Sequence, residues 1–412
     1  MKFDTIIIGG GLSGLVSGIE SVKSGRKTAI VSSGQSALHF WSGSFEFLNN
    51  ENGSVTDSPL KCAGRLPEDH PYKKIGIERT AKLLDRVVPL FAEAGISVSG
   101  SLAKNHYRLT PMGMVKPAWL TLDDYLYFDD PDDLAGKKAA IVNIYGYIDF
   151  YPRFVSLGLS KLGVECRSAD VNVSQLDILR KSTTEMRATN ISRFLCDEVV
   201  DELAREIDKV SAGTDMVVMP AVLGMFDDEP VRRLRNVVDR PIYFIATTPA
   251  SVPGVRCQLS LKELFIGLGG YFMPGDTVVR GEFSDHNLQK IYTCNFGNIP
   301  LVADNYVIST GSFFGQGLIA DMEKVYEPVF GLDLVAGKNR TDWYDKNFYA
   351  SQPYMSYGVV TDDKFRPCLN GDTVGNLYAT GALLSGFNAL KEGSGAGITL
   401  ATALHAAGEI TR

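Results

Sequence analysis

The N-terminal segment "KFDTIIIGGGLSGLVSG", residues 2–18, determines the fold class. An apolar run at residues 3–8 leads into a cluster of glycines, and apolar residues then recur at helical spacing from Leu12 to Val22. This order predicts a strand, a tight turn and an amphipathic helix. Ser24 and Gly25 end the helix, and "TAIV" (28–31) resumes as a second strand, which a right-handed crossover makes parallel to the first.

Gly9, Gly11 and Gly14 occupy the G-x-G-x-x-G frame of this turn. In that frame Gly9 makes the turn, Gly11 lets a phosphate or pyrophosphate approach the backbone, and Gly14 lets the helix pack on the strand. The helix N-terminus then faces the anion. A purely structural turn is the alternative. We favour nucleotide binding because strand, glycines, helix and second strand follow in the required order.

Ser32 stands where such folds usually carry an acidic residue that binds the 2′-hydroxyl of the adenosine ribose. Either a serine hydroxyl takes over that hydrogen bond, or the adenosine half is absent and the glycines hold a terminal phosphate. The second case describes FMN. We therefore expect FMN as the cofactor, with FAD as the alternative.

The C-terminal part of the chain carries a second glycine-rich signal. A short strand, "NLYATG" (376–381), precedes a loop of small residues that opens a helix with Ile398, Leu400 and Leu404 on one side. Backbone amides in such a loop can contact a flat ring, and the helix N-terminus would stabilise negative charge on a reduced flavin. A small-residue helix packed in a core is the alternative. The candidate cofactor residues here are Gly381, Gly393, Ser394, Gly395, Ala396 and Gly397.

The middle of the chain predicts a second α/β layer. Apolar runs within 137–150, 214–220 and 241–249 read as buried strands, and helical patterns cover 153–163 and 255–268. Residues 269–309 read as alternating antiparallel strands. "LVADNYVISTGSFF" (301–314) predicts a strand and glycine turn that return to the first sheet, and its Gly311 is a further candidate cofactor residue.

The predicted architecture is α/β: a Rossmann-like domain of the two-dinucleotide-binding flavoprotein type with an inserted second α/β domain. We assign residues 1–100 and 290–412 to the discontinuous flavin-binding domain and 101–289 to the insertion.

Composition narrows the function classes. Lys and Arg number 41 against 48 Asp and Glu, a net charge of −7, and no basic run suits a phosphate backbone, so we expect no nucleic-acid partner. Six scattered cysteines form no C-x-x-C pair, which predicts reduced thiols and no metal site. No apolar stretch approaches the roughly 20 residues of a spanning helix, so any membrane association should be peripheral.

Five motifs further along the chain make a resemblance specific. "GQSALHFWSGS" (34–44), "TEMRATNISRFLC" (184–196), "YFMPGD" (271–276), "STGSFFGQGL" (309–318) and "GVVTDDKFRPC" (358–368), with the N-terminal glycines, closely resemble the B subunit of bacterial anaerobic glycerol-3-phosphate dehydrogenase over essentially the whole chain.

The resemblance implies one subunit of a three-part complex on the cytoplasmic side of the bacterial inner membrane. Such a complex oxidises sn-glycerol 3-phosphate to dihydroxyacetone phosphate and passes electrons through flavin and an iron–sulfur subunit to menaquinone, with fumarate or nitrate as final acceptor. It implies an FAD-containing A subunit, FMN in the B subunit and an iron–sulfur C subunit that anchors the complex to the membrane.

Similar flavoproteins loop the segment after the second strand over the cofactor, which adds Ser33, Gly34, Ser42, Gly43 and Ser44 as cofactor candidates. An ordinary Ser/Gly loop is the alternative.

Two residues are the catalytic candidates. His39 could take the proton of the alcohol while hydride goes to the flavin, although a histidine held in the cluster with Phe40 and Trp41 is an equal reading. Arg366 could clamp the substrate phosphate, as could Arg187 or Arg193, and a surface salt bridge is the alternative for each. His405 reads as structural.

Three other functions stay open. The chain could be an electron relay whose partner oxidises the substrate, a free-standing FAD-dependent reductase, or a non-enzymatic scaffold with a vestigial nucleotide fold.

Overall fold

A five-stranded parallel sheet forms the centre of the computed structural model, which describes residues 1–51, 53–182 and 184–412. Its order is β15 (Tyr271–Pro274), β2 (Thr28–Ser32), β1 (Lys2–Ile8), β18 (Val302–Ile308) and β25 (Leu377–Ala379). Every neighbouring pair is parallel. Strands buried on both faces need nearly continuous apolar runs, and "TIII" and "TAIV" supply them.

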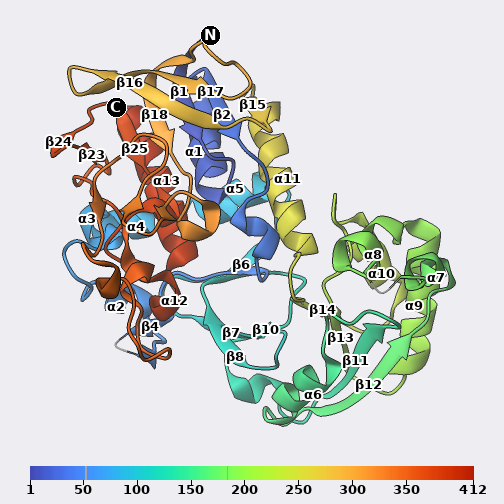
Figure 1. The fold of residues 1–412 in the computed structure, drawn as a ribbon. Helices are drawn as coiled ribbons and strands as arrows, with labels where there is room; N and C mark the ends of the chain where they lie inside the picture. Colours follow the sequence, from blue (N-terminus) through green and yellow to red (C-terminus); the bar gives the residue numbers. More distant parts are fainter. Residues whose placement is uncertain (52, 183) are drawn as a thin grey trace.

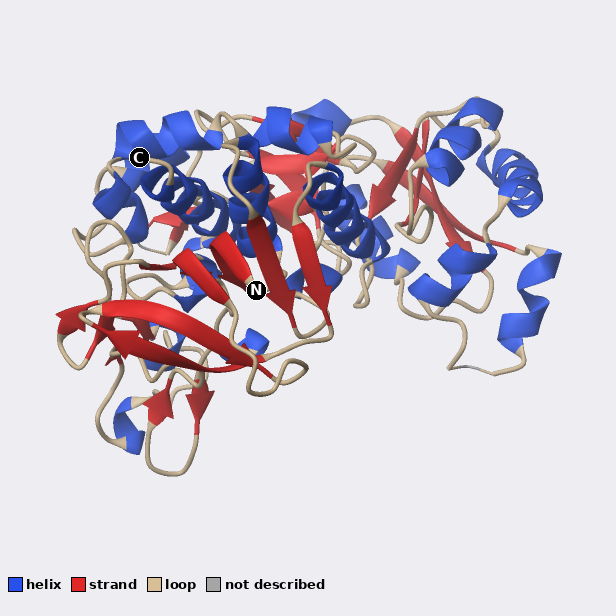
Figure 2. Ribbon diagram, turned by 90° about the horizontal axis from the view of Figure 1, so that it is seen from above, coloured by secondary structure: helices blue, strands red, loops and turns tan. Residues whose placement is uncertain are grey.

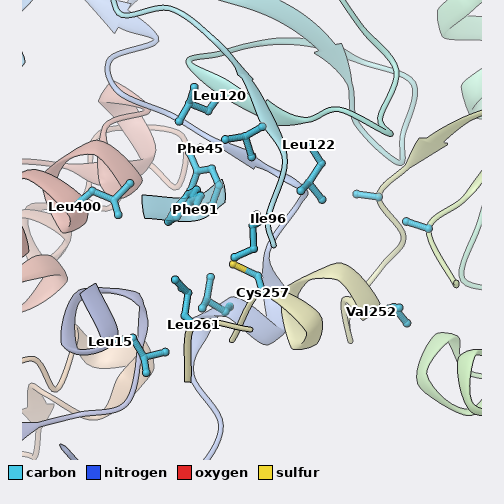
Figure 3. Packing of buried hydrophobic residues seen from close by; sticks show 14 of the residues in the cluster. Leu15, Phe45, Phe91, Ile96, Leu120, Leu122, Val252, Cys257, Leu261 and Leu400 are labelled. Atoms are coloured by element: carbon cyan, nitrogen blue, oxygen red, sulfur yellow. The ribbon is translucent and has the colours of Figure 1, made fainter. Parts of the chain in front are cut away.

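Three long helices pack beside this sheet: α1 (Leu12–Lys23), α11 (Val252–Gly267) and α13 (Gly395–Ile410) (Figure 1, Figure 2). The small residues on α1 and α13 allow close approach, and Ser17 Oγ of α1 donates to the carbonyl of Ala403 at 3.3 Å. Figure 3 shows Leu15, Leu261 and Leu400 from the three helices among the buried apolar side chains of one continuous core.

A second parallel sheet forms the inserted unit, drawn in green in Figure 1. Its order is β12 (Glu165–Val171), β11 (Lys138–Ile144), β13 (Met216–Pro220) and β14 (Ile242–Ile245). Helices α6 (Pro152–Ser160), α9 (Asp197–Ser211) and α10 (Glu229–Val237) accompany it. The predicted buried strands at 137–150, 214–220 and 241–249 are confirmed, and so is the α/β class with an added α/β layer.

The segment 269–309 differs from its prediction. β16 (Val278–Ser284) and β17 (Asn287–Thr293) pair antiparallel there, and a single antiparallel bridge joins Ile291 to Leu301, whereas β15 joins the central sheet parallel to β2. The four residues of β15 carry no local signal of their partner, because sheet membership depends on contacts distant in sequence. The predicted domain boundaries, which assign residues 101–289 to the insertion, stay a prediction. However, β15 and α11 lie within residues 101–289 and pack with the first domain.

Two small antiparallel sheets lie between the units. One has the order β10 (Tyr127–Phe128), β7 (His106–Leu109), β8 (Val115–Ala118), and the other β3 (Ser44–Phe45), β9 (Leu120–Leu122), β6 (Val98–Gly100). The second of these sheets pairs the cofactor candidate Ser44 with Thr121, and Phe45 with Leu120.

Short elements complete the chain. Among the described residues no helix is long and apolar enough to cross a bilayer. The remaining helices and strand pairs are α2 (Pro59–Ala63), α3 (Pro71–Ile75), α4 (Ile77–Leu84), α5 (Val87–Glu93), α7 (Asp177–Arg180), α8 (Ala188–Phe194), α12 (Ala389–Glu392), β4 (Asn50–Glu51) with β5 (Ser54–Val55), β19 (Ile319–Ala320) with β20 (Val325–Tyr326), β21 (Leu334–Val335) with β22 (Gly358–Val359), and β23 (Cys368–Leu369) with β24 (Asp372–Thr373).

Candidate functional site

The three glycines after β1 have different surroundings. A Cβ on Gly9 would lie 2.3 Å from the carbonyl oxygen of Ser309, and Gly9 has φ +116°. A Cβ on Gly14 would lie 1.9 Å from the carbonyl oxygen of Gly9, so this glycine lets α1 pack on β1. A Cβ on Gly11 would meet only the Cβ of Ser36, at the ordinary distance of 3.5 Å. Gly11 therefore borders open space at the start of α1.

Two long helices begin at this site without a side-chain cap. Gly11 is the N-cap residue of α1 and Ser394 that of α13, and neither offers a capping hydrogen bond from its side chain. The first N–H groups of a helix have no partner within the helix and carry partial positive charge. These N-termini without a side-chain cap and the open space over Gly11 fit a flavin, whose phosphate and ring oxygens are acceptors of such N–H groups.

A hydroxyl network joins the carboxyl ends of β18 and β25 to both helices. Ser13 Oγ donates to Thr380 Oγ1 at 2.8 Å, and Thr380 shares a second hydrogen bond with Ser309 Oγ at 2.7 Å. Gly381 N donates to Thr402 Oγ1 of α13 at 3.0 Å. The network places Gly381 beside the N-terminal glycine turn. Gly311, with φ +84°, follows β18 at the same edge of the sheet.

Ser32 lies at the end of β2 and is buried. Its Oγ donates to the carbonyl of Gly34 at 3.3 Å, and a Cβ on Gly10 would lie only 2.4 Å from that Oγ. Ser33 and Gly34 are exposed beyond it. The hydroxyl of Ser32 thus faces the glycine turn, and its role in cofactor binding stays a prediction.

An acidic residue that sequence reasoning missed lies next to Ser32. The backbone N–H of Asp276 donates to the carbonyl of Ser32 at 3.2 Å, and its carboxylate is buried. Oδ1 accepts from the N–H of Thr277 and Asn295, whereas Oδ2 has no partner among the described residues. "YFMPGD" ends in this aspartate, but only the pairing of β15 with β2 reveals its position.

The serine loop, residues 42–49, lies beside the C-terminal loop, residues 392–397. Gly397 N, in the first turn of α13, donates to the carbonyl of Glu46 at 2.8 Å, and Asn49 N donates to that of Glu392 at 2.9 Å. A Cβ on Gly393 would lie 2.6 Å from the Cβ of Asn49. The loop that begins with Ser42, Gly43 and Ser44 therefore contacts the C-terminal candidates. These are Gly393, Ser394, Gly395, Ala396 and Gly397.

Arg108 of β7 is a buried cation that sequence reasoning also missed. Its Nη2 donates to Ser42 Oγ at 2.9 Å and to Glu46 Oε1 at 3.2 Å. β7 is only four residues long, so local sequence patterns gave no reason to place Arg108 near the serine loop.

His39 lies half-buried on the turn Ala37–Phe40, close to the glycines. Burial lowers the pKa of its imidazole below 6.5, and a hydrogen bond with Gln258 of α11 partly offsets this. Gln258 Nε2 also donates to the carbonyl of Gly10 at 3.1 Å. His39 is therefore one side chain away from the glycine turn.

The three candidate arginines do not join this site. Arg366 donates Nε and Nη2 to Asp362 Oδ2, both at 2.8 Å. Its neighbour Phe365 packs edge-on against His405, ten residues beyond the start of α13, with ring centroids 5.4 Å apart. Arg187 and Arg193 are exposed at either end of α8. The catalytic assignment of Arg366 stays a prediction, and this position does not favour it.

Comparison with known proteins now defines the class of the chain. The matching family is described as an FAD binding domain, and the match covers residues 4–398. Together with the parallel sheet and its glycine turn, the match makes this chain a flavin-binding oxidoreductase, as its glycine motifs predicted.

Within that class the chain belongs to the family formed by the B subunit of anaerobic glycerol-3-phosphate dehydrogenase. The protein of that name from Yersinia enterocolitica is 41% identical over 416 residues, which cover 100% of this chain and 98% of the relative. Its counterpart from Pectobacterium carotovorum is 39% identical over 417 residues, covering 100% and 99%. The resemblance drawn from the motifs is confirmed. A solved 3-ketosteroid Δ1-dehydrogenase from Sterolibacterium denitrificans covers 100% of this chain and 99% of its own at 10% identity and a TM-score of 0.47, too slight a likeness to add to this.

Proposed function

We propose that this chain is the flavin-carrying subunit of an anaerobic glycerol-3-phosphate dehydrogenase, in which sn-glycerol 3-phosphate is oxidised to dihydroxyacetone phosphate. The observation that carries the proposal is full-length identity of 41% to a relative with that name. The N-termini of α1 and α13, which lack a side-chain cap, support it, because their N–H groups other than that of Gly397 can donate to the phosphate and ring of a flavin.

The flavin would supply the hydride acceptor. The chain must then supply a group for the proton of the alcohol. His39 is the candidate, since burial keeps its imidazole neutral and able to accept a proton near pH 7. In the oxidation of the secondary alcohol, a bound flavin would supply the acceptor for the C2 hydride, and His39 would take the hydroxyl proton.

FMN is the cofactor that we propose. Ser32 offers a hydroxyl where adenosine binding usually requires a carboxylate, so the site has lost the standard ribose ligand. FAD is the second candidate, favoured by Asp276, whose unpartnered Oδ2 lies on the segment next to Ser32.

The name of the relatives, which designates one lettered subunit of a dehydrogenase, supports a complex with other subunits. We propose an FAD-containing A subunit and an iron–sulfur C subunit that anchors the complex to the membrane and delivers electrons to menaquinone. The chain would then lie peripherally on the cytoplasmic side of the bacterial inner membrane.

The test begins with purification of the full chain, acid release of its cofactor and chromatographic identification. FMN is expected; FAD would overturn the interpretation of Ser32, and a colourless protein would refute flavin binding by the isolated chain. The second step adds sn-glycerol 3-phosphate without oxygen and follows the flavin absorbance. Bleaching of the chain alone supports direct oxidation, whereas bleaching only with the A subunit identifies an electron relay.

A further inference from the structure

Arg108 has unused hydrogen-bonding capacity although its side chain is only 5% exposed. Within the described part of the chain its side-chain hydrogen bonds all come from Nη2, to Ser42 and Glu46. Nε is buried without a partner there. A buried donor left unpaired costs roughly 1–3 kcal/mol, and more when the group is charged. Because of this cost, a buried guanidinium donor normally has an acceptor, either in the protein or in a bound ligand.

A second unpaired donor packs against the same loop, close enough to Arg108 for its charge to act on it. The ring of Tyr125 is buried, and its hydroxyl has no partner among the described residues. A Cβ on Gly43 would lie 2.4 Å from this ring, so Tyr125 packs directly against the residue that follows Ser42. Burial raises the pKa of Tyr125 far above its usual value, and the hydroxyl therefore stays a neutral donor.

Arg108 is linked to the start of α13 through Glu46. Glu46 accepts from Arg108 through its side chain and from Gly397 N through its carbonyl. The unpaired donors thus lie by the serine loop that runs alongside the proposed flavin site, where a substrate has to bind. The carboxylate of Glu46 occupies Nη2 and leaves Nε for another acceptor.

We propose that Arg108 Nε and the Tyr125 hydroxyl bind the phosphate group of the substrate. This inference rests on the proposed function, because it takes the substrate to be a phosphate monoester. A phosphate oxygen accepts strong charge-assisted hydrogen bonds from a guanidinium. The chemistry suits this pair better than Arg366, whose Nε and Nη2 already donate to Asp362 Oδ2 and whose neighbour Phe365 packs against His405, away from the start of α13.

The test compares Arg108→Gln and Arg108→Lys with the wild-type chain. Flavin content is measured from the visible spectrum, and binding of inorganic phosphate, glycerol and sn-glycerol 3-phosphate by calorimetry. We expect Arg108→Gln to keep its flavin but to bind both phosphates at least tenfold more weakly. Arg108→Lys should recover part of the affinity, since lysine restores charge without the planar fork. Arg240→Gln, which loses an arginine paired with Asp208, is the control and should bind like wild type.

Tyr125→Phe keeps the experiment informative if the arginine variants do not fold. It removes only the unpartnered hydroxyl, so we expect several-fold weaker phosphate binding with an unchanged or higher unfolding midpoint. A clearly lower midpoint would mean that the hydroxyl has a structural partner and would overturn the proposal.

The remaining outcomes separate the two proposals. Unchanged phosphate affinity in Arg108→Gln, or no phosphate binding by wild type, overturns the assignment of Arg108. Loss of flavin from a folded Arg108→Gln assigns the arginine to the cofactor and overturns it as well. If wild type binds inorganic phosphate through Arg108 but neither binds nor is reduced by sn-glycerol 3-phosphate, with or without the A subunit, the phosphate site stands and the proposed function fails.

Discussion

Gly11 and Gly14 lie in one turn, yet a side chain would act differently at each. At Gly14 a Cβ would collide with backbone, 1.9 Å from the carbonyl oxygen of Gly9. At Gly11 the nearest atom would be 3.5 Å away, and the backbone there is extended, with φ −83° and ψ −174°. The chain itself tolerates a side chain at Gly11. Only an approaching phosphate would require its absence.

We therefore predict that Gly11→Val abolishes flavin binding while the protein stays folded. Flavin absorbance after purification and the circular dichroism spectrum measure the two effects separately. Gly14→Ala is the matched control, and it should lower the free energy of unfolding by about 1–3 kcal/mol because backbone must shift. A folded Gly11→Val protein that remains fully yellow would show that the phosphate lies elsewhere.

His39 predicts a pH dependence. Burial lowers its pKa below 6.5, and a base acts only when it is neutral. Activity should therefore be constant around pH 7 and fall only as the pH drops below 6.5. The pH profile of kcat/KM for the assembled dehydrogenase measures this acid limb, and His39→Gln should remove the limb together with about 10²–10⁴-fold of the rate. An acid limb that persists unchanged in His39→Gln would assign it to another group.

At the scale of elements, the sequence predicted what local patterns control. The unit β1–α1–β2 has an apolar run, a glycine turn and a helical repeat within 32 residues, and all three were found in place. The positions of β15, Asp276 and Arg108 depend on pairing between segments far apart in the chain. No local pattern encodes such pairing, so the sequence could not show that Asp276 neighbours Ser32 or that Arg108 contacts Ser42.

The helix α13 carries a built-in sensitivity to acid through His405. Both ring nitrogens are buried without partners among the described residues, and burial lowers the pKa of the imidazole to about 4. The unfolded chain, with an ordinary pKa near 6.5, takes up a proton first as the pH falls. Above pH 6.5 His405 therefore does not lower the free energy of unfolding from this cause. Between pH 6.5 and 4 it lowers the free energy of unfolding progressively.

We predict that His405→Leu reduces this loss. At pH 5 the ordinary pKa of 6.5 lies 1.5 units above the pH, and this difference corresponds to a loss of about 2 kcal/mol in the free energy of unfolding of wild type. The leucine variant should not show this loss. Urea unfolding of both proteins at pH 7.5 and pH 5 measures it. Equal losses in the two proteins on acidification would disprove the role of His405.

At the scale of the whole molecule, one arginine links the inserted unit to the central domain. Arg256 of α11 donates Nη1 to the carbonyl of Gly224 at 2.7 Å and lies 3.6 Å from Asp124 Oδ2. The N–H of Phe244 in β14 donates to the carbonyl of the same Asp124 at 2.9 Å. Both charged side chains are largely buried, at 12% and 15% exposure. The position of the insertion therefore depends on a buried ion pair.

Removing one member of such a pair leaves the other charge without compensation. We predict that Arg256→Ala lowers the free energy of unfolding by about 3–5 kcal/mol, because the carboxylate of Asp124 stays buried and the carbonyl of Gly224 loses its donor. Adding Asp124→Asn should restore part of this loss, since the amide carries no charge. Urea unfolding of wild type, both single variants and the double variant forms the cycle that isolates the pair. Because Arg256 lies outside the glycine turn, the folded fraction of each variant should keep its flavin. Additive losses in the double variant would mean that Arg256 acts through the Gly224 carbonyl alone.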